Sequence, residues 1–256
     1  MARVSGADTS SLDELRAEVE RLRAALAARE AQAADKEDQL QRYAADLRET
    51  FKEERARAQE LRDSYFATVR ALTNAVEARD AYTGKHAERV AAYALEIGNA
   101  VGERWAGSPE IEFGFLLHDI GKVAVPDSIL HKPEPLTAHE RELIQQHPVT
   151  GWEIVRQVDF LGAASDVVRH HHERWDGDGY PDGLKGDEIP LTARVFAVAD
   201  TLDALTTTRP YRPASPIGDA RALIHEGRGT QFDPTVVDAF EAMPDEVFKR
   251  IREDIG

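Results

Sequence analysis

The chain has 256 residues, 42% of them hydrophobic, which allows one compact domain with a buried core plus an additional segment. Its 32 basic and 47 acidic residues give a formal net charge of −15, which argues against binding nucleic acid through its phosphates, and the absence of cysteine excludes disulfides and thiolate metal sites. No apolar run reaches the ~18 residues of a membrane span, and the first residues lack a signal-peptide core. We therefore expect a soluble, cytoplasmic protein.

Residues 12–64 carry an apolar repeat that is typical of a coiled coil, after a short polar stretch, 1–11, that predicts a disordered start. Neither Pro nor Gly interrupts residues 10–80, so a nearly continuous helix is expected. A charged single helix is the alternative, but it would leave the repeat exposed. We predict a self-associating helix, most simply a parallel homodimer, although an antiparallel pair also fits. The repeat consists of Leu12, Leu15, Val19, Leu22, Leu26, Leu40, Tyr43 and Leu47.

Residues 65–256 predict an all-α domain, because apolar residues recur at helical spacing and no segment alternates as a strand does. Helix-capping and helix-breaking residues divide this region into separate helices. Thr137 and Glu140 form a capping-box pattern, and Asp233-Pro234 begins another helix. The expected helices cover about 83–101, 109–119, 137–146, 148–155, 163–172, 194–205, 234–240 and 245–254, and a Gly- and Asp-rich loop covers 175–183.

A neighbouring His118 and Asp119 follow the apolar run 113–117. A carboxylate at the end of a core-facing segment is costly unless it is paired or bound to a metal ion. Imidazole and carboxylate together suit Mn, Fe and Zn. The alternative is an ordinary helix C-terminus that ends at Gly121.

Five of the nine histidines lie at segment ends or beside acidic residues. Adjacent residues at a helix end point about 100° apart, so a pair such as His171-His172 can serve two metal ions rather than one. Asp119 and Asp200 are candidates to bridge two ions, as two-metal hydrolytic sites require. Spacing alone leaves a metal site and ordinary helix ends equally open. The five histidines are His86, His118, His147, His171 and His172.

Four other polar residues are expected to have structural roles only. We expect Asp203 to cap or pair within its own helix, Glu173 and Arg174 to form a surface pair, and His170 to be exposed.

The motifs resemble the HD-GYP domain, a subgroup of the HD phosphohydrolase superfamily. The resemblance covers about residues 65–245 and excludes the predicted coiled coil. The matching stretches are 79–86, 118–122, 146–148, 171–181, 199–212 and 231–234, the fourth of which contains the Gly179-Tyr180-Pro181 run.

The resemblance implies a metal-dependent phosphodiesterase that hydrolyses the bacterial second messenger cyclic di-GMP to pGpG, GMP or both. It implies two divalent ions, Fe or Mn, because Tyr82 stands where some members have the Glu of a third site. Lys122, Arg209 and Arg212 would hold the substrate phosphate, and Tyr180 would lie in the loop beside it. The implied metal ligands are His86, His118, Asp119 (bridging), His147, His171, His172 and Asp200.

In this chemistry, a hydroxide bridging the two ions attacks phosphorus in line, and the ions and Lys122 stabilise charge on the phosphoryl oxygens. Two alternatives remain open. One is a catalytically weak signalling module that binds diguanylate cyclases or sensor proteins, and the other is a phosphohydrolase of a different nucleotide. We also expect the N-terminal helix to align two catalytic domains and to regulate them.

Overall fold

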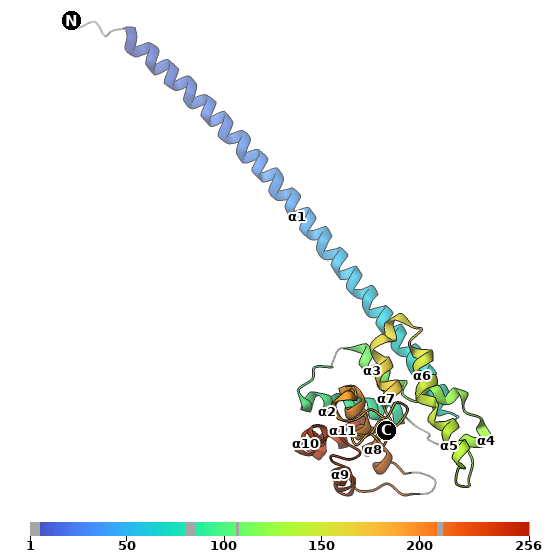
Figure 1. Ribbon diagram of the computed structural model, residues 1–256. Helices are drawn as coiled ribbons and strands as arrows, with labels where there is room; N and C mark the ends of the chain where they lie inside the picture. The colour runs from blue at the N-terminus through green and yellow to red at the C-terminus, as the bar shows by residue number, and fades with distance from the viewer. Residues whose placement is uncertain (1–5, 80–84, 106–107, 209–211, 256) are drawn as a thin grey trace. The chain divides into compact units, whose positions relative to one another are not determined.

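The computed structural model describes residues 6–79, 85–105, 108–208 and 212–255, and these ranges contain helices and no strand (Figure 1). The predicted all-α fold is confirmed. The chain divides into two units, residues 1–63 and 64–256. The α-helices are α1 (Gly6–Glu77), α2 (His86–Val101), α3 (Pro109–Leu116), α4 (Asp127–Leu130), α5 (Ala138–Gln145), α6 (His147–Val155), α7 (Ser165–His170), α8 (Leu191–Thr206), α9 (Ile217–Glu226), α10 (Pro234–Ala242) and α11 (Asp245–Ile255), and the 3-10 helices are η1 (Ile120–Ala124), η2 (Asp159–Ala164) and η3 (Gly186–Glu188).

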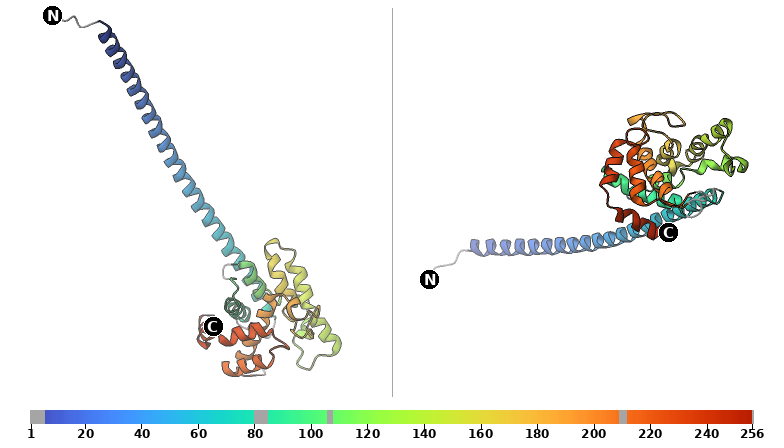
Figure 2. Two further views of the ribbon diagram at one scale, coloured as in Figure 1. Left: turned by 60° about the vertical axis from the view of Figure 1, so that its left-hand side comes forward. Right: turned by 90° about the horizontal axis from the view of Figure 1, so that it is seen from below.

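The first unit consists of the greater part of α1, which is one unbroken helix in both views of Figure 2. It begins at Gly6, so the helix includes residues 6–11, for which the sequence predicts a disordered start. Residues 7–11 contain neither Pro nor Gly, so nothing in them breaks the helix that follows. The apolar repeat lies exposed on the described chain: Leu12, Leu15, Leu22 and Leu26 are each more than half exposed.

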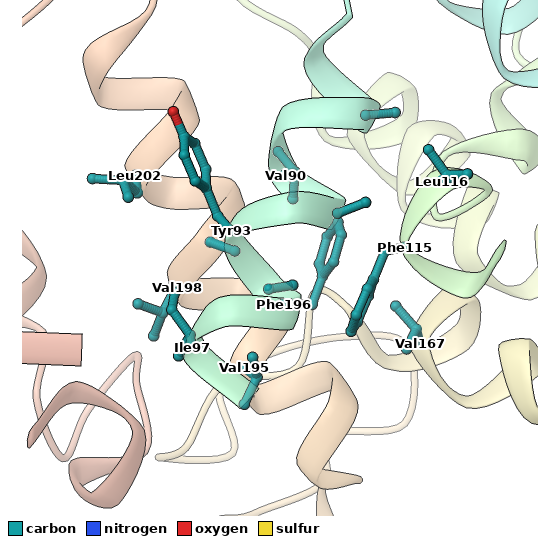
Figure 3. Packing of buried hydrophobic residues seen from close by; sticks show 14 of the residues in the cluster. Val90, Tyr93, Ile97, Phe115, Leu116, Val167, Val195, Phe196, Val198 and Leu202 are labelled. Atoms are coloured by element: carbon teal, nitrogen blue, oxygen red, sulfur yellow. The ribbon is translucent and has the colours of Figure 1, made fainter. Parts of the chain in front are cut away.

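The core of the second unit lies where α2 and α8 pack together (Figure 3). Tyr93 and Ile97 of α2 and Phe196 of α8 are fully buried, as is Phe115 of α3, whose ring stacks on Phe196 at 5.7 Å between centroids. Burying each such side chain stabilises the fold by roughly 1.5–3 kcal/mol. These two helices therefore form a rigid base for residues at their ends.

Several predicted helix boundaries are confirmed at the level of individual hydrogen bonds. Thr137 and Glu140 form the predicted capping box, and Asp233 caps α10 by accepting the N–H of Thr235 at 2.7 Å. α2 begins at His86, and the cap predicted at Thr83 lies outside the described residues. α9 was not predicted, because its short apolar pattern follows a loop rich in Pro and Ser.

Among the described residues, no helix is both long enough and apolar enough to cross a membrane.

Candidate metal centre

The seven predicted ligand residues lie at helix ends or on one helix face, and the second unit brings them together. His86 is the first residue of α2, and His147 is the first residue of α6. A cavity of about 270 Å³ is lined by six of the seven, and the seventh, His147, is buried and lies 3.2 Å from Asp119. The six are His86, His118, Asp119, His171, His172 and Asp200.

The Asp119 carboxylate lies at the middle of this cluster. Its Oδ1 is 3.2 Å from His147 Nε2 and 3.9 Å from His171 Nε2, whereas its Oδ2 is 3.1 Å from His118 Nε2 and 2.8 Å from Lys122 Nζ. Burial acts to raise the pKa of Asp119, but the charges of His118 and Lys122 outweigh burial and hold the pKa well below its ordinary value. The carboxylate is therefore ionised, with one oxygen turned toward each of two histidine sets.

The first set combines Asp119 with His147, His171 and His172, whose ligand atoms all lie within 4.8 Å of one another. His147 Nδ1 is 2.7 Å from the carbonyl of Ile144, and His171 Nδ1 is 3.0 Å from that of Val168. A carbonyl only accepts, so each Nδ1 carries a hydrogen, and each ring turns its Nε2 toward the cluster. The two Nε2 atoms are 3.2 Å apart.

Two imidazoles of this set, those of His171 and His172, are neutral. Burial, together with the neighbouring His172 and His147, lowers the pKa of His171 well below its ordinary value. Burial and His147 lower the pKa of His172 to about 3. Neutral imidazole is the form that binds metal ions, so protons do not compete with a metal at neutral pH.

The second set contains His86 and Asp200, with His86 Nε2 at 3.4 Å from Asp200 Oδ1, together with His118 and the second oxygen of Asp119. The His86 ring contacts the His118 ring at 5.7 Å between centroids. His118 Nδ1 is 2.9 Å from the Phe115 carbonyl, so it donates there and turns its Nε2 toward Asp119.

Asp203 orients His86 from behind. His86 Nδ1 lies 2.7 Å from Asp203 Oδ2, and Arg89 Nε donates to Asp203 Oδ1 at 2.7 Å. Burial acts to raise the pKa of Asp203, but the hydrogen bonds from His86 and Arg89 outweigh burial and lower it to about 2. The prediction that Asp203 pairs within its own helix is wrong: its partners are on α2. The one-turn spacing of Asp200 and Asp203 was the available signal, since it places both on one face of α8.

These two sets fit a pair of divalent metal ions. Imidazole nitrogens and carboxylate oxygens converge in both sets, and the outer ring nitrogens lie at hydrogen-bond distance from carbonyls or a carboxylate, as in ordinary metal-binding histidines. Asp119 belongs to both sets. The donor set contains no thiolate, because the chain has no cysteine.

A close backbone contact holds η1 against α6 and so fixes Asp119 beside His147. A Cβ added at Gly121 would lie 1.9 Å from the His147 carbonyl oxygen and 2.5 Å from Gly151 N. Only glycine allows this approach, which explains the glycine two residues after Asp119.

The loop after His172 is built around a buried carboxylate. Glu173 accepts the N–H groups of Asp182 at 2.8 Å and Leu184 at 3.1 Å, and the Tyr180 ring stacks on His172 at 4.7 Å between centroids. The predicted surface pair of Glu173 and Arg174 is therefore wrong, since Arg174 binds Asp176 instead.

His170 is also not exposed as predicted. Its side chain keeps 13% of its accessible surface, and its Nδ1 lies 3.5 Å from Asp182 Oδ2.

The structure describes only some of the predicted phosphate-binding residues. Lys122 lines the cavity, whereas Arg212 donates to the Ala204 carbonyl at the cavity edge at 2.5 Å. Arg209 and Tyr82 lie outside the described residues.

The sequence did not indicate that Thr73 and two other residues at the end of α1 also line the cavity. Their helical pattern continues that of the N-terminal repeat, so nothing set them apart from it. The others are Val76 and Glu77.

Comparison with known proteins identifies the family to which this chain belongs. The family model described as HD domain matches residues 70–236. The chain is 42% identical over 174 residues to the cyclic di-GMP phosphodiesterase response regulator RpfG of Xanthomonas campestris pv. campestris, covering 67% of this chain and 46% of that protein. It is 39% identical over 181 residues to the 3'3'-cGAMP-specific phosphodiesterase 2 of Vibrio cholerae, covering 70% of this chain and 35% of that protein.

A solved structure has the same fold. The cyclic GMP-AMP specific phosphodiesterase V-cGAP3 of V. cholerae superposes with a TM-score of 0.54 at 20% identity, covering 72% of this chain and 52% of that one. The chain spans about half or less of the length of these relatives. The HD-type domain predicted from the motifs is confirmed, and the chain belongs to the HD domain family.

Proposed function

We propose that this chain is a metal-dependent phosphodiesterase that hydrolyses cyclic di-GMP to pGpG, GMP or both. The observation that carries the proposal is the Asp119 carboxylate between two histidine sets at one cavity, with Lys122 Nζ 2.8 Å from its Oδ2. The name of the Xanthomonas relative supports the substrate.

The proposed cofactors are two divalent ions, Fe or Mn. Asp119, His147, His171 and His172 would hold one ion, and His86, His118, Asp119 and Asp200 would hold the other. When bound, such ions activate water for attack and stabilise charge on phosphoryl oxygens.

The residues around the ions have separate proposed tasks. The Lys122 ammonium, at the cavity wall, would stabilise charge on a non-bridging phosphoryl oxygen, and Arg209 and Arg212 would bind a phosphate of the substrate. Tyr180, whose ring stacks on His172, would limit the space beside the substrate.

Hydrolysis of 3'3'-cGAMP is a second candidate, favoured by the name of the V. cholerae relative. The two substrates share their phosphodiester linkages and differ in one base. The metal centre would therefore hydrolyse either one, and contacts to the bases would determine which substrate is preferred. A catalytically weak module that binds diguanylate cyclases or sensor proteins is less favoured, because binding alone does not need seven converging ligands.

The proposal includes a cytoplasmic homodimer formed by the N-terminal helix. Leu12, Leu15, Leu22 and Leu26 recur on α1 and are exposed, and a coiled coil would bury them. Such a dimer would align two catalytic domains and let a signal reach them through the helix.

The test is anaerobic incubation of Mn²⁺- or Fe²⁺-loaded protein with cyclic di-GMP, 3'3'-cGAMP or pGpG, with products separated by chromatography. The proposal predicts faster turnover of cyclic di-GMP than of 3'3'-cGAMP. The reverse order would establish the second candidate, and no turnover of either by fully loaded protein would favour the signalling module. Asp119→Ala is the inactive control.

A further inference from the structure

The C-terminal end of α1 and the two residues after it bind the backbone on both sides of the metal centre. Three side chains within seven positions, Thr73, Glu77 and Arg79, each make a hydrogen bond to a segment that carries candidate ligands. All three belong to the second unit, which begins at residue 64.

Arg79 holds the segment that carries Asp119 and Lys122. Its guanidinium donates to the carbonyls of Val123 at 2.9 Å and Val125 at 3.0 Å, and to Asp127 Oδ1 at 2.7 Å, with a longer contact of 3.4 Å to the Lys122 carbonyl. The Val123 and Val125 carbonyls lie at and just beyond the end of η1, where the last carbonyls of a helix lack donors within the helix, whereas the Lys122 carbonyl also accepts the Val125 N–H at 3.0 Å. One side chain therefore fixes the far end of the 3-10 turn whose first residues follow Asp119.

Glu77 holds the segment that carries His86. α2 begins after Lys85, which has a left-handed backbone (φ 61°) and provides no side-chain cap. Glu77 Oε1 instead accepts the N–H of Ala87 at 2.8 Å, so a carboxylate from another helix caps α2 and complements its dipole.

Thr73 makes the third of these hydrogen bonds, to the segment that leads to His118. Its Oγ1 donates to the Leu116 carbonyl at 3.1 Å, at the end of α3 and two residues before His118. The hydrogen bond is buried, and its loss would leave a carbonyl without that partner.

We infer that Arg79 and Glu77 are positioning residues of the metal centre: Arg79 acts through Asp119 and Lys122, and Glu77 acts through His86. Without them each of the two ligand segments loses hydrogen bonds that tie it to the end of α1, and the distance between the two histidine sets is less tightly fixed. Partners that orient metal ligands in this way are commonly worth 10–100-fold in metal affinity. The inference rests on the proposed metal centre.

The chain offers a matched control for Arg79. Arg221 donates to Asp245 Oδ1 at 2.8 Å and to the carbonyls of Phe240 at 3.0 Å, Glu241 at 3.4 Å and Met243 at 2.6 Å. Arg221→Ala therefore removes the same kind of contact, three carbonyls and one aspartate, from a region that holds no candidate ligand.

The experiment measures the Mn²⁺ dissociation constant of the whole chain by competition with a chromogenic chelator, alongside thermal unfolding. Arg79→Ala is expected to weaken Mn²⁺ binding about 10-fold or more, whereas Arg221→Ala lowers the melting temperature and leaves the dissociation constant unchanged. Equal effects of the two variants on metal affinity, or none from Arg79→Ala, would overturn the inference. Failure of the wild-type chain to bind Mn²⁺ would instead refute the proposed metal centre.

Glu77 provides a second and milder test if Arg79→Ala does not fold. Glu77→Gln keeps a carbonyl oxygen that can accept the Ala87 N–H, and it should retain most of the metal affinity. Glu77→Ala removes that acceptor and should weaken binding. Equal metal affinity in the two variants would contradict the positioning role.

Discussion

The Nε2 atoms of His147 and His171 lie 3.2 Å apart, and each ring donates its other nitrogen's hydrogen to a backbone carbonyl. An Asp119 carboxylate oxygen lies 3.2 Å from His147 Nε2, so two imidazole nitrogens and a carboxylate oxygen converge at this point. A divalent cation bound there would have all three groups as ligands. We therefore expect a bound metal ion to stabilise this arrangement.

Metal removal should destabilise the second unit. A ligand present at 100 times its dissociation constant stabilises the folded state by about 2.7 kcal/mol, so dialysis against a chelator should lower the melting temperature and added Mn²⁺ should restore it. Differential scanning calorimetry checks this. Asp119→Ala serves as the control, since its melting temperature should not respond to the chelator. An identical response in both proteins would argue against the site.

Single ligand substitutions should separate the two ions. His172→Ala should remove the ion of the first set and His86→Ala that of the second, leaving about one ion per chain in each case. Asp119 contacts both sets, so Asp119→Ala should remove both ions and abolish hydrolysis. His118→Ala should remove the ion of the second set and also abolish hydrolysis. Metal analysis of the purified variants gives the count. Retention of about two ions by Asp119→Ala would contradict a bridging carboxylate.

Gly121→Ala should destabilise the fold and weaken metal binding together, because the new methyl group would collide with the His147 carbonyl. Overpacking against backbone costs about 3 kcal/mol. Urea denaturation and metal titration measure the two effects. Gly218→Ala is the matched control, as no atom lies within 4 Å of the added carbon, and it should be neutral or stabilising.

Asp203→Asn should lower the free energy of unfolding by about 3–5 kcal/mol, since it removes the negative charge that faces the buried Arg89. It should also weaken metal binding, since Asp203 orients His86. Asp238→Asn, at the exposed pair with Arg228, should leave the free energy of unfolding nearly unchanged, because solvent screens this pair. Chemical denaturation of both variants tests the difference. Comparable losses in the free energy of unfolding would show that burial does not increase the contribution of the Asp203–Arg89 pair.

The capping box of α5 predicts a pH dependence. The hydrogen bond from Lys132 and that from Thr137 lower the pKa of Glu140 from 4.5 to about 2. A pKa that is lower in the folded state stabilises the fold above pH 4.5, and this stabilisation is lost as the pH falls toward 2. The melting temperature of Glu140→Gln should therefore lie below that of the wild type at pH 6 and approach it near pH 2. Glu134→Gln, at an exposed loop residue, should show no such trend.

The sequence predicted the helices whose ends carry explicit caps, such as Thr137 and Asp233, because local hydrogen bonds decide those boundaries. It also predicted the seven candidate ligands as a group, and the structure brings them together at one cavity. Their roles as ligands stay a proposal.

Contacts between distant segments could not be predicted. Asp203 pairs with His86 and Arg89 across more than a hundred residues, and no local pattern encodes that pairing. Glu173 resembles a surface residue in sequence, yet it is buried because the following loop folds back and donates two N–H groups to it. The contacts of Arg79 could not be predicted for the same reason. Two of its acceptors are backbone carbonyls, which every residue has whatever its side chain.

The most direct test of the central claim is an anaerobic titration of metal-free protein with Mn²⁺, in which bound metal and cyclic di-GMP hydrolysis are measured on the same samples. Hydrolysis should be absent without metal and should reach its maximum at about two bound ions per chain. Hydrolysis by the metal-free protein, or none with both ions bound, would contradict the central claim.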